Sequence, residues 1–299
     1  MIDVIIVNWN SGAGLEACLD SLTSLAPNIR GQIIVVDNQS SDGSESCCGK
    51  WTQVNLIHAG GNLGFARACN LGAQRSTSEW MLFLNPDTRF LPPTQDALFG
   101  MLSKLDDRTG ICGAQLLDEE GRVARSCARF PSPWMFLCHT VGVDRFIPSL
   151  GYPMQDWDHF TSRNVDHVIG AFYLVRRKLF QELNGFDERF FLYLEDLDFS
   201  LRARQSGWNT LFCADLKIFH EGGGTSKQIK ATRLFYDLRS RLLYAQKYFP
   251  SWQARFQVMA MICLEPLSRF IGILLRPSKN AFKELFQGYT KFLHWWVHA

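Results

Sequence analysis

Short apolar runs alternate with helical patterns through the first half of the chain. The apolar runs predict strands at residues 4–7, 33–36, 55–57 and 80–84, and the patterns between them predict helices at residues 15–25 and 65–75. Continuous apolar strands are typical of a parallel sheet that helices cover on both faces. We therefore expect an α/β fold with a mostly parallel, Rossmann-like sheet. In such folds ligands bind at the carboxyl ends of the strands.

The second half of the chain first loses this rhythm and then regains it. Residues 117–166 contain four prolines and several glycines, which is typical of a binding loop or lid, or of disorder. The pattern then predicts a strand at residues 167–175, followed by helices at 176–183, 193–206 and 228–248.

Two residues that follow predicted strands have the chemistry of metal ligands. Asp87 ends the segment Asn85-Pro86-Asp87, and it could hold a divalent cation through one oxygen. A turn that merely ends the strand is the alternative for this segment. His220 ends a strand and precedes three glycines, whose backbone amides could approach a phosphate while the imidazole binds a metal. A lone histidine is more often structural.

Three carboxylates crowd the first turn of the helix predicted at 193–206. Glu195, Asp196 and Asp198 would stabilise the helix dipole there, but three exceed what the dipole needs. Like charges raise one another's pKa, whereas the helix N-terminus lowers it. One of these carboxylates could therefore stay ionised at neutral pH and still accept a proton.

Two further segments could contact a nucleotide. Arg67 lies near the start of a predicted helix after Asn62, where it could meet a diphosphate, or it is an ordinary surface arginine. Residues 12–17, Gly-Ala-Gly-Leu-Glu-Ala, have the spacing of a dinucleotide fingerprint with Asp37 about 20 residues further on. This pattern would suit an NAD-dependent dehydrogenase that needs no metal. However, three residues separate the first glycine from the strand, and Ser11 as a helix N-cap is the structural alternative.

Together these segments resemble the inverting family 2 glycosyltransferases of the GT-A fold, and among them the rhamnosyltransferase-like group. The resemblance covers about residues 2–248. It rests on VNWNS at 7–11, DNQSSDGS at 37–44, NLGFARACNLG at 62–72, LNPDT at 84–88, GAFYLVRR at 170–177, FDERFFLYLEDLDFSLRARQSGW at 186–208 and HEGGGTS at 220–226.

The resemblance implies a role for each matching residue. For the nucleotide, Asp37 would bind a pyrimidine base, the loop after Asn8 would shape the pocket, Asn62 and Arg67 would lie along the nucleotide, and Asn85 would lie near the ribose or diphosphate. Asp87 and His220 would hold Mg²⁺ or Mn²⁺ on the diphosphate. Asp196 would be the general base, and Glu195 would position the acceptor or the base.

The reaction that the resemblance implies is transfer of a sugar with inversion. L-rhamnose from dTDP-rhamnose is the favoured donor, with other dTDP- or UDP-sugars behind it. The acceptor would be a hydroxyl of a glycan, lipid-linked and growing on the cytoplasmic face of the membrane, and residues 117–166 would frame it. A catalytically silent GT-A domain that acts as a membrane-surface scaffold is the alternative from a different functional class.

The composition limits the choice of partner. The 299 residues carry 31 basic and 29 acidic side chains, a net charge of +2, which argues against a nucleic-acid partner. The nine cysteines include no CxxC pair, so we expect buried reduced thiols and no zinc site. The N-terminus has no signal-peptide pattern, so we expect a cytoplasmic protein.

The C-terminal segment differs from the rest of the chain. Residues 251–299 carry six basic and two acidic side chains, +4, and nine aromatic residues, so the preceding part carries −2. The apolar run at 256–275 almost reaches the length of a membrane span, but Glu265, Pro266 and Arg269 interrupt it. We expect a catalytic domain at 1–226 and C-terminal helices at 227–299 that lie on the inner face of the cytoplasmic membrane. Helices that cover the core or form a homodimer contact are the alternative.

Overall fold

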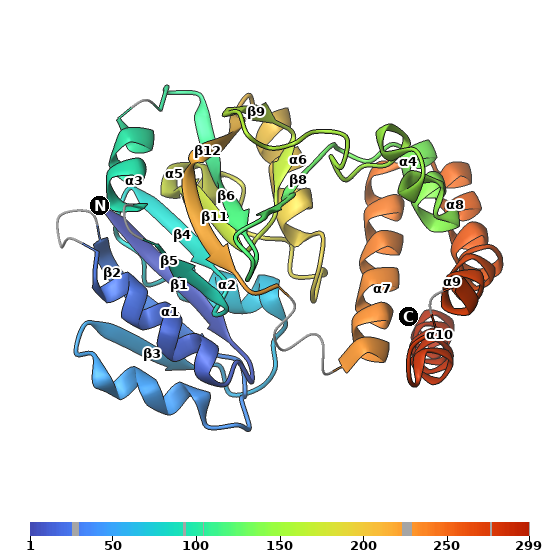
Figure 1. Ribbon diagram of the computed structural model, residues 1–299, viewed down its shortest axis with the longest axis horizontal. Coiled ribbons are helices and arrows are strands. Elements are labelled where there is room, and N and C mark those ends of the chain that lie inside the picture. The colour runs from blue at the N-terminus through green and yellow to red at the C-terminus, as the bar shows by residue number, and fades with distance from the viewer. Residues whose placement is uncertain (26–29, 92–93, 104, 223–228, 276, 299) are drawn as a thin grey trace.

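The computed structural model describes residues 1–25, 30–91, 94–103, 105–222, 229–275 and 277–298. Figure 1 shows a sheet with helices on both faces beside a separate group of helices, which we call the helical lobe (α4 and α7 to α10). The strands are β1 (Ile2–Asn8), β2 (Arg30–Asp37), β3 (Val54–His58), β4 (Trp80–Leu84), β5 (Thr88–Phe90), β6 (Thr109–Leu117), β7 (Val123–Ala124), β8 (Cys127–Ala128), β9 (Arg163–Val165), β10 (His167–Val168), β11 (Phe172–Arg176) and β12 (Asn209–His220). The helices are α1 (Ala13–Thr23), α2 (Phe65–Ala73), α3 (Thr94–Leu102), α4 (Pro133–Val141), α5 (Arg177–Glu182), α6 (Glu195–Gln205), α7 (Lys230–Tyr248), α8 (Ser251–Cys263), α9 (Glu265–Leu275) and α10 (Ala281–His298), with 3-10 turns η1 (Ser44–Lys50), η2 (Val143–Arg145) and η3 (Pro148–Leu150).

The main sheet confirms the predicted α/β class. Its strand order is β3-β2-β1-β4-β11-β6-β12-β5, with β7 beside β6 and β9 beside β12. Strands β1 to β4 are parallel to one another, whereas β11 runs antiparallel to both β4 and β6. The four strands expected in the first half of the chain are present. The pattern did not predict β5, α3 or β6.

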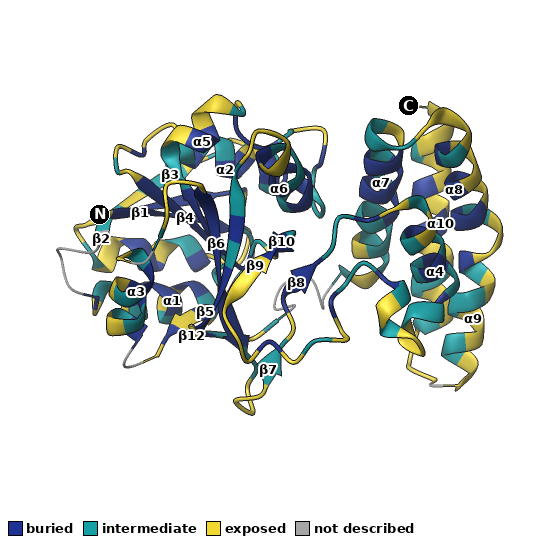
Figure 2. Ribbon diagram, turned by 90° about the horizontal axis from the view of Figure 1, so that it is seen from above, coloured by how far each residue is buried: buried dark blue, intermediate teal, exposed yellow. Residues whose placement is uncertain are grey.

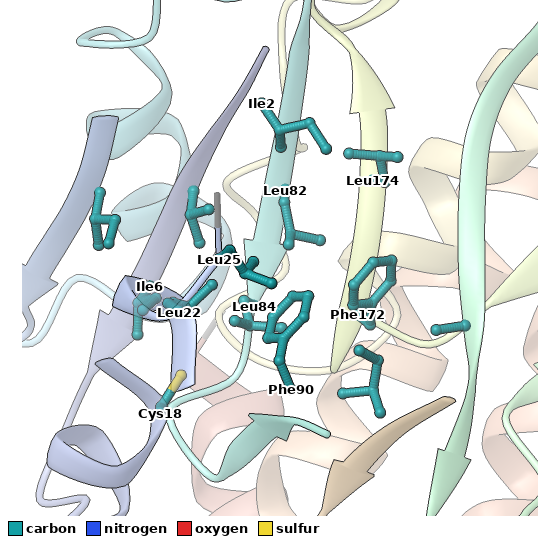
Figure 3. Close-up of a cluster of buried hydrophobic side chains, with 14 of the residues drawn as sticks. Ile2, Ile6, Cys18, Leu22, Leu25, Leu82, Leu84, Phe90, Phe172 and Leu174 are labelled. Atoms are coloured by element: carbon teal, nitrogen blue, oxygen red, sulfur yellow. The ribbon is translucent and has the colours of Figure 1, made fainter. Parts of the chain in front are cut away.

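Both faces of the sheet are packed against helices, which explains the continuous apolar strands. Every residue of β1 is buried. On one face, Ile6 and Leu84 pack against Cys18 and Leu22 of α1 (Figure 3). On the other face, β1 packs so closely on α2 that a Cβ on Gly72 would lie 2.6 Å from the Ile5 side chain. Eight of the nine cysteines are buried with free thiols, and Cys263 is exposed.

The strand expected at residues 167–175 is broken, and this prediction was wrong. β10 pairs with β8 in a small separate sheet, whereas β11 joins the main sheet between β4 and β6. The backbone N–H of Gly170 donates to Asp196 Oδ2 at 2.7 Å, so it is not available for a strand ladder. The strand is therefore interrupted where the backbone of Gly170 binds a side chain of α6.

The segment at 117–166 is ordered, so the interpretation as disorder was wrong. It contains β7, β8, β9 and α4, which begins after Ser132, whose Oγ accepts a hydrogen bond from Met135 N at 3.2 Å. α4 packs against α8 and α9 in the helical lobe. The segment thus runs from the sheet to the C-terminal helices.

The helical lobe is attached to the main sheet and its helices through α7. Asp198 of α6 is fully buried and contacts Arg202, Lys247 and the Tyr248 hydroxyl. It is a structural residue, because these contacts within α6 and with α7 engage its carboxylate. The boundary expected at residue 226 lies outside the described residues.

Candidate active site

A cleft of about 960 Å³ opens where β1, β2 and β4 end. The loops after these strands, the break between β10 and β11, the start of α6 and the end of β12 line it. The first turns of α7 form a further wall, with Arg233, Tyr236 and Asp237. A volume of this size suits a ligand as large as a nucleotide sugar. Polar residues that follow β1, β2 and β4 therefore lie around one cleft, as the sequence predicts.

Asn8 and Asp37 tie two loops together at one end of the cleft. Asn8 is fully buried, and its Nδ2 lies 3.0 Å from both Asp37 Oδ1 and Ser40 Oγ. Asp37 is 6% exposed, and its Oδ2 accepts a hydrogen bond from Ser40 N at 3.3 Å. Neither Asn8 nor Asp37 lines the cleft; Asn8 braces the loop after β2, whose residues Asn38, Ser41 and Asp42 do line it.

Asn62 lines the cleft and shapes the loop before α2. Its Oδ1 accepts hydrogen bonds from Asn38 Nδ2 at 3.0 Å and from Gly64 N at 3.1 Å. Gly64 has φ = 81°, and a Cβ there would lie 2.4 Å from the carbonyl oxygen of Phe191. Only glycine fits this close approach between two loops of the cleft.

Arg67 lies away from the cleft, contrary to the expectation that it meets a diphosphate. Its neighbours Ala66 and Ala68 are buried in the core, so the helix turns residue 67 outward. The guanidinium is 3.7 Å from Glu188 Oε2, and the side chain is 60% exposed. The geometry therefore favours the ordinary surface arginine.

Asp87 and His220 meet because β5 crosses over to pair with β12. Thr88 of β5 is in register with His220, which brings Asp87 Oδ1 to 3.3 Å from His220 Nε2. Asn85 Nδ2 lies 3.5 Å from the same ring nitrogen. Gly223 and Gly224, two of the three glycines expected near phosphate, lie outside the described residues.

The Asp87 and His220 pair fits two ligands of a divalent cation. Two adjacent ligands of an octahedral ion with bonds of about 2.1 Å lie roughly 3 Å apart, close to the observed 3.3 Å. Among the described residues no group of three or more His, Cys, Asp or Glu side chains could hold a metal ion. Asp87 and His220 would thus supply two of the ligands of such an ion.

Glu195 and Asp196 face the cleft at the start of α6. The two residues before them, Tyr193 and Leu194, adopt left-handed φ angles of 69° and 65°. Such angles each cost about 1–3 kcal/mol in a residue that is not glycine, and they turn the helix start into the cleft. Asp196 accepts hydrogen bonds from Gly170 N at 2.7 Å and Leu197 N at 2.8 Å, which fix the orientation of its carboxylate.

The environments of the two carboxyl groups differ. Glu195 is 4% exposed, and its burial, together with the negative charge of Asp196, raises its pKa well above the usual range. Its Oε2 has no hydrogen-bond partner among the described residues. Asp196 is more open, with a side chain that is 15% exposed. Burial and the neighbouring charge therefore favour the protonated form of Glu195, whereas Asp196 is the more exposed carboxyl group of the two.

His167 was missed as a site residue, although it lies behind Asp196. Its Nε2 is 3.7 Å from Asp196 Oδ2, and its Nδ1 is 3.0 Å from Ser200 Oγ, which in turn contacts the Tyr173 hydroxyl. Burial lowers the pKa of His167, so the neutral ring is favoured. The only signal in the sequence is a polar residue in an otherwise apolar run. The α7 residues of the cleft wall carry no such signal, because only tertiary packing brings them there.

The two glycines of residues 12–17 both line the cleft, and they meet different local constraints. Gly12 is the N-cap of α1 with φ = 55°, and its N–H donates to Asp42 Oδ2 at 2.8 Å. A Cβ on Gly14 would lie 3.3 Å from the carbonyl oxygen of Pro86. The hydroxyl of Ser11 donates to Asn8, so the expectation that Ser11 caps the helix was wrong.

Comparison of the sequence with known proteins finds glycosyltransferases. A sequence model of glycosyl transferase family 2 matches residues 3–184, and one of glycosyl transferase family group 2 matches residues 151–297. An N-acetylglucosaminyl-diphospho-decaprenol L-rhamnosyltransferase of Mycobacterium tuberculosis is 28% identical over 271 residues, which are 85% of this chain and 87% of the relative. The rhamnosyltransferase WbbL of Escherichia coli K12 is 24% identical over 82% of this chain and 92% of its own.

Solved structures of other proteins have a fold similar to that of this chain. A mannosyltransferase of Pyrobaculum calidifontis, in complex with GDP-Man and Mn²⁺, aligns with a TM-score of 0.57 at 14% identity over 98% of this chain and 86% of its own. The Staphylococcus aureus protein TarS, residues 1–349, aligns with a TM-score of 0.55 at 15% identity over 97% of this chain and 79% of its own. Both alignments include the helical lobe, since they cover almost the whole chain.

Proposed function

The chain belongs to glycosyl transferase family 2, and we propose that it transfers L-rhamnose from dTDP-rhamnose to a hydroxyl of a lipid-linked glycan. It is an inverting glycosyltransferase of polysaccharide synthesis with a GT-A fold. This membership rules out the NAD-dependent dehydrogenase. The observation that carries the proposal is the meeting of Asp196, Glu195, Asp87 and His220 around one cleft.

In the proposed reaction Asp196 is the general base. It accepts the proton of the acceptor hydroxyl as that oxygen forms a bond to the anomeric carbon of the donor sugar. The bond from the anomeric carbon to the diphosphate oxygen breaks in the same step, and a single displacement inverts the carbon. The protonated Glu195 can donate a hydrogen bond to the sugar or the acceptor, because its Oε2 has no partner among the described residues.

The donor would lie along the loops after β1, β2 and β4. Asp37, braced by Asn8, would contact the pyrimidine base, Asn62 would contact the nucleotide, and Asn85 would lie near the ribose or diphosphate. Asp87 and His220 would hold a divalent cation, Mg²⁺ or Mn²⁺. When bound, this ion would neutralise charge on the departing diphosphate. The Mn²⁺ in the mannosyltransferase complex supports this assignment.

The acceptor class follows from the relatives. The name of the Mycobacterium tuberculosis relative specifies a sugar on a diphospho-decaprenol carrier as its acceptor. By analogy we assign a glycan on a lipid diphosphate to this chain, with the enzyme peripheral on the cytoplasmic face of the membrane. The cleft wall formed by α7 and by Arg125 and Tyr152 of the 117–166 segment would frame this acceptor.

A donor panel tests the proposal. The purified chain is incubated with dTDP-rhamnose, other dTDP- and UDP-sugars and a polyprenyl-diphosphate GlcNAc acceptor, with Mn²⁺, Mg²⁺ or EDTA. We expect transfer from dTDP-rhamnose that needs a divalent cation, and an inverted anomeric centre by NMR. Efficient transfer from a different donor would overturn the rhamnose assignment. A chain that binds nucleotide sugars but transfers none would favour the catalytically silent scaffold.

A further inference from the structure

Helix α9 has its polar and apolar sides reversed relative to a helix of a soluble protein. Its charged residues Glu265 and Arg269 face the inside of the lobe, and the Glu265 carboxylate accepts hydrogen bonds from Arg241 Nη2 at 2.6 and 2.8 Å. Ile271 and Leu275, in contrast, are 55% and 74% exposed. Water normally meets the charged side of a surface helix. The apolar side of α9 therefore faces an environment other than plain water.

A second segment extends this apolar surface from far away in the sequence. Phe146 and Ile147, after η2, are exposed, Phe146 by 84%. The turn lies against α9, because Ser268 Oγ donates to Val141 O at 3.0 Å and a Cβ on Gly272 would lie 3.6 Å from Arg145 Nη1. We call this combined surface the apolar edge, and its members are Phe146, Ile147, Leu267, Ile271, Leu274 and Leu275.

The apolar edge continues onto α10 at the outside of the lobe. Phe270 of α9 contacts Phe282 of α10 with ring centroids 5.3 Å apart, and both rings are half exposed. Figure 2 shows exposed residues along the side of the lobe that faces away from the sheet. A surface this apolar on a monomer marks a binding site for a protein or a membrane.

Charges around the apolar edge distinguish between these two partners. Arg145, Lys279 and Lys283 are exposed beside it. The nearby carboxylates are already engaged, Glu265 with Arg241 and Glu284 with Lys230. A second copy of the chain would bring rims of the same positive sign together, which disfavours pairing. Anionic lipid headgroups would complement this rim, while the apolar side chains enter the acyl boundary.

We propose that the apolar edge docks the helical lobe on an anionic lipid bilayer, with α9 lying in the plane of the membrane. Residues Ser251–Leu275 are long and apolar enough to cross a bilayer, and only 22% of their most apolar window is buried. Crossing would pull Glu265 out of its pair with Arg241, which is fully buried. An in-plane helix keeps this pair intact and still buries the apolar edge. Docking does not depend on the transfer reaction, so either proposal can fail alone.

Vesicle flotation with the full chain tests the docking. Vesicles of phosphatidylcholine with phosphatidylglycerol are compared with pure phosphatidylcholine, and Ile271→Asp and the pair Phe146→Ser/Ile147→Ser are compared with the unaltered chain. The matched control is Phe160→Ser, an exposed aromatic residue of the sheet domain. Circular dichroism and thermal melting check that each variant is folded. We expect at least a tenfold loss of anionic-vesicle binding for both edge variants and no change for the control.

The remaining outcomes are also decisive. The double variant Lys279→Gln/Lys283→Gln should bind anionic vesicles more weakly and should leave binding to pure phosphatidylcholine unchanged. Washing with carbonate at pH 11 should release the docked protein. Retention after carbonate extraction would overturn the in-plane helix in favour of a span. Unchanged flotation of the folded edge variants would overturn the docking surface. A dimer in light scattering that Ile271→Asp dissociates, together with no vesicle binding, would assign the surface to a second copy.

Discussion

Substituting Glu195 by glutamine isolates the consequence of a buried, protonated carboxyl group. Glu195 is 4% exposed and lies beside Asp196, and burial followed by this neighbouring charge raises its pKa well above the usual range. The folded chain therefore holds a proton at pH values where the unfolded chain has released it. Glutamine has nearly the same shape, is neutral at every pH and keeps a hydrogen-bond donor.

The sign and the size of the effect follow from proton linkage. Because the folded state binds more protons than the unfolded state, the free energy of unfolding falls as the pH rises above the pKa of Glu195 in the unfolded chain. The slope is about 1.4 kcal/mol per pH unit, and it continues up to the pKa in the folded protein. In the Glu195→Gln variant this fall of the free energy of unfolding with pH is absent. The variant should match the unaltered chain near pH 4 and become progressively more stable than it from pH 5 upward.

Urea denaturation followed by circular dichroism at half-unit steps from pH 4.5 to 8 measures the difference. The pH at which the difference levels off gives the pKa of Glu195 in the folded chain. Glu188→Gln is the matched control, because the Glu188 side chain is 50% exposed and does not line the cleft. A flat difference for Glu195→Gln would mean that Glu195 ionises normally. A difference that favours the unaltered chain as the pH rises would reverse the sign and refute the reasoning.

Three further predictions concern the base, the cation and the lobe. Asp196→Asn should lower kcat about 10²- to 10⁴-fold, with donor affinity by calorimetry unchanged, and normal turnover would exclude it as the base. Asp87→Ala and His220→Ala should each remove the dependence of nucleotide-sugar binding on Mn²⁺ in titration calorimetry, and a metal-independent wild type would contradict the cation site. Glu265→Ala should lower the free energy of unfolding in urea by about 3–5 kcal/mol, because Arg241 is left buried without its bidentate partner. A loss below about 1 kcal/mol would show that water or Asp237 compensates.

The parallel half of the sheet could be predicted because strands that are buried on both faces have continuous apolar sequences. All seven residues of β1 and all five of β4 are buried, and residues 4–7 and 80–84 are continuous apolar runs. Once these strands are parallel, their carboxyl ends must share one edge, and the polar residues that follow them converge. Asn62 and Asp87 are brought to the cleft, and Asp37 to a position beside it, by this rule alone.

The meeting of Asp87 with His220 could not be predicted from local patterns. It depends on β5, a strand of three residues whose sequence Thr-Arg-Phe has no periodicity to detect. The strand exists because its partner β12 is already in place, so the information is in the tertiary contact. The break between β10 and β11 has a similar origin, since the backbone at Gly170 is held by a side chain of α6.

The position of Arg67 shows a different limit. A motif places an arginine near a helix start, but the direction of the side chain depends on which helix face the core occupies. Ala66, Ala68 and Cys69 bury their side of α2, which leaves Arg67 to solvent and to Glu188. Counting positions along the helix after fixing its buried face would have found this.

Helix α7 determines how the membrane hypothesis must be tested. The sequence suggests truncation after Phe249, because this removes the basic aromatic segment. In the structure Leu238 and Leu242 of α7 are buried against Val258, Met261 and Phe292, which that truncation would delete.

Truncation would also disturb the catalytic cleft. It would remove Glu265 and Arg269, so that the fully buried Arg241 keeps its ion pair with Asp237, at 3.1 Å, and its hydrogen bond to Thr140 Oγ1, at 3.4 Å, but loses Glu265. Asp237 itself lines the cleft. A truncated chain would therefore lose membrane binding, folding and activity together, and its behaviour could not be assigned to lipid contact. Substitutions of exposed side chains such as Ile271 leave the Arg241 cluster intact, so they alone can separate docking on the membrane from the integrity of the cleft wall.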